Sequence, residues 1–151
     1  MNKKTGLVIF IIAIIVVLIF IAMNYIRSEI YSSDGNPIKN IYVKNVPVKV
    51  EVVNSKEKIE KGLAGRASIS PGRGMLFLMP NSDYQKFWMK GMQFSIDIIW
   101  ISQDKVTGCE KNISPQDDRI FTSPAPSSSV LEVPEGFCDK NMISVNDSIR
   151  Q

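Results

Sequence analysis

The chain has 151 residues, a formal net charge of +3 at pH 7 and no histidine. Its length provides for one domain with a hydrophobic core in addition to a membrane segment. Without histidine, Ser-His-Asp and Cys-His catalytic arrangements and His-ligated zinc sites are excluded within the chain. No Gly-rich phosphate-binding loop occurs either, and we expect neither a metal site nor a cofactor.

The first feature in chain order is an uncharged apolar segment from Gly6 to Met23, which contains no proline. A helix of that length would extend about 27 Å, close to the thickness of the hydrocarbon layer of a bilayer. No small-x-small cleavage site follows the apolar run, which favours a retained anchor over the alternative of a cleaved secretory signal. The sequence therefore predicts a transmembrane signal-anchor helix over residues 6–26.

The charges that flank this segment predict its orientation. Lys3 and Lys4 precede it, whereas Arg27 follows it with Glu29 close by. The more basic flank of a membrane helix stays in the cytoplasm. We therefore expect residues 1–5 to form a cytoplasmic stub and the C-terminal part of the chain to lie outside the cytoplasmic membrane.

The charge balance beyond the membrane segment limits the partners of the protein. All fifteen acidic residues and fifteen of the eighteen basic residues lie after position 28. This part of the chain therefore lacks the concentrated positive charge that nucleic-acid binding requires, and we expect no nucleic-acid partner. Residues 39–66 have a local excess of basic side chains, which form either a solvated face or a contact with anionic lipid headgroups.

A polar segment follows the predicted membrane helix. Residues 27–40 contain Asp-Gly and Asn-Pro pairs, which favour turns, so we expect a short tether that leads to a domain over residues 41–151. Valines at every second position of Val46–Val52 predict a half-buried strand. Asn54, three residues before a glutamate, predicts the start of a short helix that ends near Gly65.

The remainder of the domain alternates short apolar segments with turn-forming residues. Met75–Met79 predicts a buried strand, and Gln85–Lys90 with Ile96–Ser102 predict a hairpin. Further short elements are predicted at Val106–Ile113, Val130–Val133, Glu135–Asn141 (one or two helical turns) and Ile143–Ile149. Together they predict a mainly β fold, either a β-sandwich or a partly closed barrel with one or two short helices, preceded by one transmembrane helix.

Sulfur-containing residues raise two questions. Cys109 and Cys138 form either a disulfide that closes a loop of about 30 residues or two buried free thiols, because sequence does not fix the distance between their Cα atoms. Four methionines have the soft ligand atoms that copper(I) prefers, but their leucine and phenylalanine neighbours favour a role in the core. These methionines are Met75, Met79, Met89 and Met92.

The segment that is most informative about function contains Trp88, Lys90 and Asp97. An aspartate within an apolar strand needs a partner, because an unpaired buried carboxylate is unfavourable. If Lys90 lies opposite Asp97 across the predicted hairpin, this charge pair shares one face with Trp88. The arrangement is either a salt bridge that closes one end of a barrel or a polar pocket floored by Trp88.

Glu132 is a second acidic residue that needs a partner, since it stands between Leu131 and Val133 in an apolar strand. Together with Asp97 it would supply a carboxylate pair for acid–base chemistry of the glycoside-hydrolase type, although the sequence does not fix their separation. Arg73 is a further candidate neighbour of this site.

At these residues the chain resembles a known group, the domain-of-unknown-function family 192, also called uncharacterised protein family 0127. The resemblance implies a compact, mainly β, sandwich-like domain that is often exported or linked to a membrane, and it implies no activity. The chain departs from the family pattern at Gly91 and Asn146, and it lacks a cysteine in the loop after Ser114. The stretches that carry the resemblance, over roughly residues 45–150, are Lys61-Gly62-Leu63, Gly74-Met75-Leu76-Phe77, Phe87-Trp88-Met89-Lys90, Asp97-Ile98-Ile99, Val130-Leu131-Glu132-Val133-Pro134 and Val145-Asn146-Asp147.

These features favour a membrane-anchored extracytoplasmic binding module that recognises a small ligand or another envelope protein. The alternatives are a hydrolase or lyase that uses Asp97 and Glu132 with Lys90, and a structural or assembly factor of the cell envelope. No catalytic residue is assigned. The candidate ligand-binding residues are Trp88, Lys90, Asp97, Glu132 and Arg73.

Overall fold

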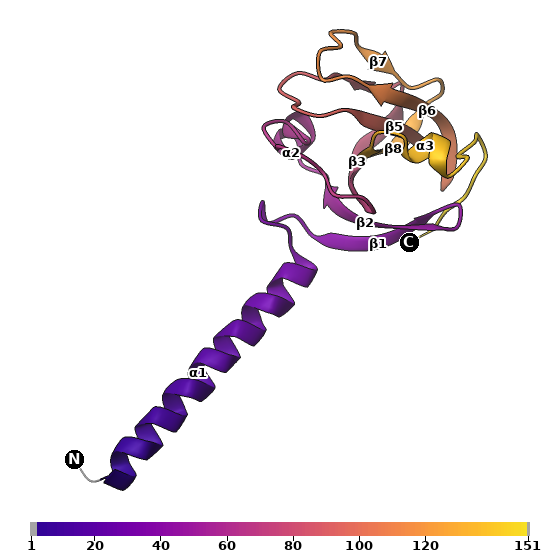
Figure 1. Cartoon of the computed structure of the whole chain (residues 1–151). Helices are drawn as coiled ribbons and strands as arrows, with labels where there is room; N and C mark the ends of the chain where they lie inside the picture. The colour runs from indigo at the N-terminus through magenta and orange to yellow at the C-terminus, as the bar shows by residue number, and fades with distance from the viewer. Residues whose placement is uncertain (1–2, 151) are drawn as a thin grey trace.

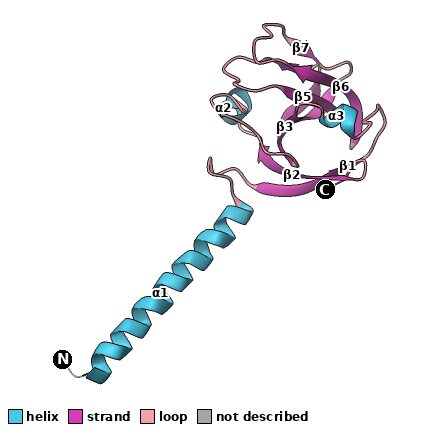
Figure 2. Cartoon of the chain, viewed as in Figure 1, coloured by secondary structure: helices cyan, strands magenta, loops and turns pink. Residues whose placement is uncertain are grey.

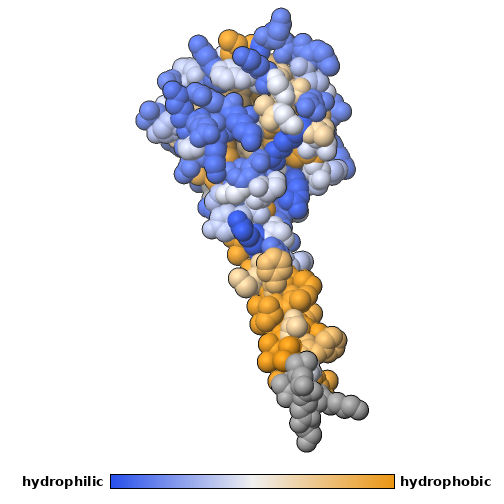
Figure 3. Space-filling view, turned by 90° about the vertical axis from the view of Figure 1, so that its left-hand side faces the viewer, coloured by the Kyte–Doolittle hydropathy of each residue, from blue (hydrophilic) through white to orange (hydrophobic). Residues whose placement is uncertain are grey.

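A long N-terminal helix stands apart from a compact β domain in the computed structural model, which describes residues 3–150 (Figure 1). This helix, α1, spans Lys3–Ile30. Within the described part of the chain it is the one helix long and apolar enough to cross a membrane, and its apolar window is not buried against the domain. Figure 3 shows apolar surface concentrated along this helix, whereas the visible face of the domain is largely polar. Residues 1 and 2 of the expected cytoplasmic stub lie outside the described residues.

The connection between helix and domain differs from the expected tether over residues 27–40. Helix α1 continues to Ile30, because no helix-breaking residue interrupts it before that point. The chain then turns back on itself, with an isolated antiparallel bridge between Tyr31 and Pro37, and enters β1 at Ile38–Val43. The polar segment is therefore helix, turn and strand in succession.

The domain is built on one curled sheet that forms a half-barrel, which confirms the predicted mainly β fold. Within residues 3–150 this sheet has seven strands in the order β6-β5-β8-β3-β2-β1-β9, and β2 and β3 run parallel to each other. The strands that follow β1 in this sheet are β2 (Val46–Val53), β3 (Arg73–Asp83), β5 (Ile96–Ser102), β6 (Lys105–Ile113), β8 (Ser127–Pro134) and β9 (Ile149–Arg150).

Smaller elements cover the sheet. Strands β4 (Lys86–Phe87) and β7 (Phe121–Thr122) pair in a separate two-stranded sheet. Helices α2 (Lys56–Lys61) and α3 (Phe137–Lys140) lie on opposite sides of the domain in the view of Figure 2.

Alternate side chains of the central strand β8 point into two different hydrophobic cores. Leu131 and Val133 belong to a core that includes the valines of β2 and Cys138. Val130 belongs to the other core, which includes Phe77, Phe87, Met89 and Trp100. Because successive side chains of a strand point to opposite faces, Glu132 lies on the side of this second core.

The predicted hairpin of Gln85–Lys90 with Ile96–Ser102 is wrong. Strand β5 pairs with β6 on one side and with β8 on the other, whereas Lys86–Phe87 pairs with β7. Every residue of Ile96–Ile101 is buried, so the backbone N–H and C=O groups along both edges of this strand need partners from neighbouring strands. Gly91, with φ of +79°, instead lies in a turn between β4 and β5.

Two other elements also differ from the predictions in their boundaries. The N-cap of α2 is Ser55 rather than Asn54, and the helix ends at Lys61, with Gly62 as its C-cap, rather than near Gly65. At the C-terminus only Ile149–Arg150 forms a strand, because Asn146, with a positive φ of 74°, belongs to a turn.

Cys109 and Cys138 form a disulfide, with their Cα atoms 6.9 Å apart. It joins β6 to α3 across a sequence separation of 29 residues. The sequence left open whether these cysteines form a disulfide or two thiols. The disulfide forms because β5 pairs with both β6 and β8, which brings β6 next to α3. The four methionines lie in or against the second core, Met75 and Met89 being fully buried.

Removal of this disulfide should destabilise the domain. Replacing both cysteines, Cys109→Ala with Cys138→Ala, should lower the free energy of unfolding by about 3.5 kcal/mol, because the link restricts the unfolded chain. Urea unfolding of the full chain in detergent, followed by tryptophan fluorescence, measures the loss. Reduction of the wild-type protein should produce the same loss, and an unchanged midpoint in both samples would contradict the prediction.

Candidate functional site

The centre of the candidate site is a carboxyl group in an otherwise apolar layer. Glu132 lies on β8 between Met75 of β3 and Ile98 of β5. Met75 is 1% exposed, Ile98 is fully buried, and Glu132 itself is only 4% exposed. No hydrogen-bond partner for its Oε2 atom occurs among the described residues. A buried carboxyl group without a partner is unfavourable for folding, so its presence here needs a reason other than stability.

Glu132 lines a pocket on the outer side of the second core. The pocket is open to solvent and has a volume of about 70 Å³, which suits a small ligand rather than a large molecule. Its walls come from α2 and the turn after it, from Met79 of β3, from Glu132 of β8, and from β4 with the segment that follows. The lining residues are Ile59, Glu60, Lys61, Gly62, Leu63, Ala64, Met79, Lys86, Phe87, Trp88, Lys90, Met92 and Glu132.

Two turns close against each other to form this pocket. After α2 the chain turns at Gly62, whose φ of +49° is unfavourable for a residue with a side chain. A Cβ atom at Gly62 would lie 3.8 Å from Oε2 of Glu132. The backbone N–H of Gly65 then donates to the carbonyl of Gly91 at 2.9 Å. The turn after α2 is thereby fixed to the segment that contains Trp88 and Lys90.

The residue after Gly65 anchors the same turn. Arg66 donates hydrogen bonds to the carboxylates of Glu51 on β2 and Asp34 in the connection after α1. Burial alone would raise the pKa of Glu51, but the hydrogen bonds from Arg66 and Asn36 outweigh it and hold this pKa at about 2. The ion cluster is therefore charged at neutral pH and holds the pocket wall to the sheet.

At Glu132, in contrast to Glu51, burial determines the direction of the pKa shift. Desolvation raises the pKa of this carboxyl group to about 8, and the positive charge of Arg66 opposes the shift only in part. At neutral pH the group is therefore mostly protonated. A protonated carboxyl group is both a hydrogen-bond donor and an acceptor, so it can bind polar groups that a carboxylate would repel.

The predicted site residues divide into two sets. Trp88, Lys90 and Glu132 line the same pocket. The hairpin that was predicted to place Trp88 and Lys90 beside Asp97 does not form. Trp88 is 47% exposed, so its indole ring remains available at the pocket. Arg73 lines a different hollow, between β2 and β3, together with Lys49 and Arg66.

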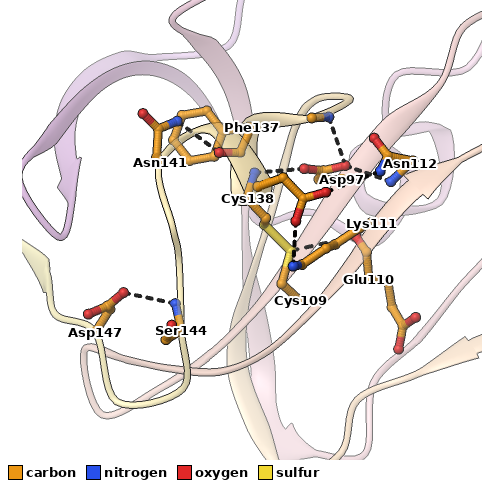
Figure 4. Close-up of polar contacts among 12 residues, drawn as sticks. Asp97, Cys109, Glu110, Lys111, Asn112, Phe137, Cys138, Asn141, Ser144 and Asp147 are labelled. Carbon is orange, nitrogen blue, oxygen red and sulfur yellow. Dashed lines mark hydrogen bonds and ion pairs between the residues drawn. A yellow bond between two sulfur atoms is a disulfide. The ribbon is translucent and has the colours of Figure 1, made fainter.

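Asp97 also lies away from the pocket, and its role is structural. Its buried carboxylate accepts hydrogen bonds from the backbone N–H groups of Asn112 at 2.7 Å, Gly136 at 3.2 Å and Cys138 at 2.8 Å. Figure 4 shows these contacts beside the disulfide. The expected Lys90–Asp97 pair is replaced by these backbone donors, which satisfy the carboxylate directly.

The surroundings of Asp97 do not offer a second site. Asp97, Cys109 and Cys138 place possible ligand atoms within 4.8 Å of one another. Both sulfur atoms are bonded to each other, however, and are therefore not free to bind an ion. Asp97 pairs with Val133 in the sheet register while Ile98 pairs with Glu132, so the two carboxyl groups point to opposite faces. This arrangement gives no support to a catalytic carboxylate pair.

Sequence reasoning missed the contribution of α2 and the turn after it. Lys61, Gly62 and Leu63 line the pocket, and the only signal for them was their place in the family resemblance. Stretches around Trp88 and Glu132 carry that resemblance too, so segments far apart in the sequence meet at this pocket.

The chain belongs to the family of domain-of-unknown-function 192 (DUF192), described as "Uncharacterized ACR", which it matches over residues 39–151. No curated protein matches the chain.

Two solved structures share the fold. A protein of unknown function from Novosphingobium aromaticivorans DSM 12444 is 24% identical, with a TM-score of 0.76 over 81% of this chain and 91% of that one. A putative transcription regulator from Sinorhizobium meliloti 1021 is 23% identical, with a TM-score of 0.72 over 76% of this chain and 94% of that one. These similarities establish the half-barrel fold.

The pKa of Glu132 predicts how stability depends on pH. Because its folded value of about 8 lies above the ordinary value of 4.5, the folded chain keeps a proton that the unfolded chain releases. The stabilising effect is complete below the ordinary pKa and is lost as pH rises to the folded one. Across that range the wild-type protein should lose on the order of 4 kcal/mol relative to Glu132→Gln.

Urea unfolding at a series of pH values measures this difference. The control is Glu135→Gln, which changes an exposed glutamate and should keep the pH dependence of the wild type. If the wild-type protein and Glu132→Gln lose stability in parallel, the carboxyl group of Glu132 is not protonated in the folded chain.

Proposed function

We propose that this protein is a membrane-anchored binding module, which holds a small ligand in the pocket of Glu132, Trp88 and Lys90. The observation that carries the proposal is the carboxyl group of Glu132, which is 4% exposed and unpartnered among the described residues yet lines an open pocket. A ligand that hydrogen-bonds to this group would remove the cost of burying it. Small-molecule sites commonly combine apolar walls with one or two such polar groups.

The same residues argue against a purely structural role for the domain. In a filled barrel the polar groups would be paired and covered, as Asp97 is by three backbone N–H groups. At the pocket, in contrast, the indole ring of Trp88 is half exposed and Glu132 is unpaired within the described part of the chain. The second carboxylate that a glycoside-type reaction requires is on the other face of the sheet. Binding is therefore the function that these contacts support best.

The location that fits this function is the outer face of the cytoplasmic membrane. Two observations support it: the apolar helix with its basic N-terminal flank, and the disulfide, which persists in oxidising compartments. The domain follows the helix directly, with a salt bridge between Glu29 of α1 and Lys49 of β2. The pocket would then face ligands outside the cell while remaining close to the bilayer.

Ligand binding can be tested with the full chain in nanodiscs, using fluorotryptophan labelling. Trp88 is half exposed at the pocket, whereas Trp100 is fully buried in the core. A fragment that enters the pocket should shift the fluorine resonance of Trp88 and leave that of Trp100 in place. A screen of small polar and apolar fragments should therefore yield ligands that affect Trp88 alone.

A matched pair of variants shows whether such ligands occupy the pocket. Ala64→Phe places a ring at the pocket wall, whereas Ala67→Phe makes the same change at an exposed position outside it. The first substitution should abolish the shift of Trp88 and the second should preserve it. If no fragment shifts Trp88, or if both variants respond as the wild type does, the proposal is wrong.

The proposed orientation has its own test. Alkaline carbonate should leave the intact protein in the membrane fraction, because an apolar helix holds it there. Protease added to spheroplasts should digest the C-terminal domain while a cytoplasmic marker protein stays intact. Release by carbonate contradicts the anchor, and protection of the domain until the cells are lysed contradicts the orientation.

A further inference from the structure

The rim of the Glu132 pocket is positively charged. Among the described residues that line it, the ionised side chains are three lysines, Lys61, Lys86 and Lys90, and one glutamate, Glu60. All four are exposed. Glu60 lies 3.9 Å from Lys56 and Lys61 lies 4.0 Å from Asp34. Lys86 and Lys90 are therefore the rim lysines without an ion-pair partner among the described residues. Lysine ammonium groups are donors without acceptors, so this rim is suited to a negatively charged group.

The interior of the pocket is mainly apolar. Ile59, Leu63, Met79, Phe87 and Met92 supply its apolar walls, and Trp88 offers an exposed ring. An inorganic anion such as phosphate would leave this apolar surface unused, whereas an aromatic or branched hydrocarbon group would bury it. The pocket volume is about 70 Å³ and the pocket is open to solvent, so a ligand ring would lie partly outside it, against the exposed ring of Trp88.

We propose that the pocket binds a small organic acid, whose negative charge is held by the rim lysines together with the carboxyl proton of Glu132 and whose apolar part lies against Trp88 and Leu63. This inference rests on the proposed binding function and names its ligand class. It assigns two kinds of donor to one anion: the ammonium groups at the rim and the un-ionised carboxyl group inside.

The opposite charge class is the main competitor. A buried glutamate beside a tryptophan ring also suits an organic cation, through ion pairing and a cation–π contact. Such a cation would have to pass three lysines at the rim and would require Glu132 to ionise inside an apolar pocket. Both requirements oppose it.

The pH dependence of binding affinity should differ in sign between an organic anion and an organic cation. Burial raises the pKa of Glu132 to about 8, so the group is un-ionised at neutral pH and ionised in alkaline solution. An anion binds next to the un-ionised form and is repelled by the ionised form, so its affinity should fall as pH rises past the folded pKa. The affinity of a cation should rise over the same range.

Three probes with a common ring separate these possibilities: benzoate, benzamide and benzylamine. Each is titrated into the full chain in zwitterionic nanodiscs, which contain no anionic lipid, and the fluorine resonance of Trp88 is followed. At about pH 6 benzoate should bind about tenfold more tightly than either of the others. At about pH 9 that advantage should be largely lost.

Substitutions at Glu132 and Lys90 show which side chain is responsible for benzoate binding and for its pH dependence. Glu132→Gln keeps an uncharged hydrogen-bonding side chain, so benzoate should bind to it with little dependence on pH. Lys90→Met should weaken benzoate binding about fivefold and leave benzamide unaffected. Lys39→Met is the matched control, because Lys39 is an exposed lysine on β1 outside the pocket. An unchanged resonance of Trp100 shows that each variant is folded.

The outcomes separate this inference from the function on which it rests. If benzamide or benzylamine binds at least as tightly as benzoate, or if benzoate binds more tightly at alkaline pH, the organic-acid class is wrong and the pocket remains a binding site. The class is also wrong if Lys39→Met weakens benzoate as much as Lys90→Met does. If neither these probes nor the fragment screen shifts Trp88, the binding function itself fails.

Discussion

The register of the central strand β8 is the constraint on which the structure depends. Leu131 and Val133 point into one core, so Glu132 must point toward the other, between Met75 and Ile98. A slip of one residue would place the carboxyl group in the core of β2 and α3 and remove two large apolar side chains from it. The packing that stabilises the half-barrel therefore also forces one acidic group into an apolar layer.

Two buried carboxyl groups illustrate how surroundings determine the role of a residue. Asp97 meets three backbone N–H groups, which makes it part of the connection between β5, β6 and the start of α3. Glu132 meets no donor within the described residues and lines a pocket instead. The first group stabilises the fold through these hydrogen bonds, whereas burial of the second favours its protonated form.

The pocket is linked to the part of the chain that follows the apolar helix α1. Its wall continues into Arg66, and this guanidinium group bonds both Glu51 on β2 and Asp34 in the connection after α1. The low pKa of Glu51, about 2, keeps this cluster charged at neutral pH. One ion cluster thus fixes the turn that forms the pocket and the segment that joins the domain to α1.

The sequence alone determined the features that depend on local pattern: the apolar helix, the strands with period-two burial, the mainly β class and the family. It also singled out Asp97 and Glu132, because an acidic residue in an apolar strand is conspicuous without any knowledge of its partners. Trp88 and Lys90 were singled out through a hairpin with Asp97 that does not form. Only the tertiary structure decided that Asp97 is satisfied by backbone groups, that Cys109 meets Cys138, and that the turn after α2 completes the pocket. Strand pairing brings these groups together across long sequence separations. Pairing depends on which strands have buried backbone groups along both edges, and this is a property of the whole sheet.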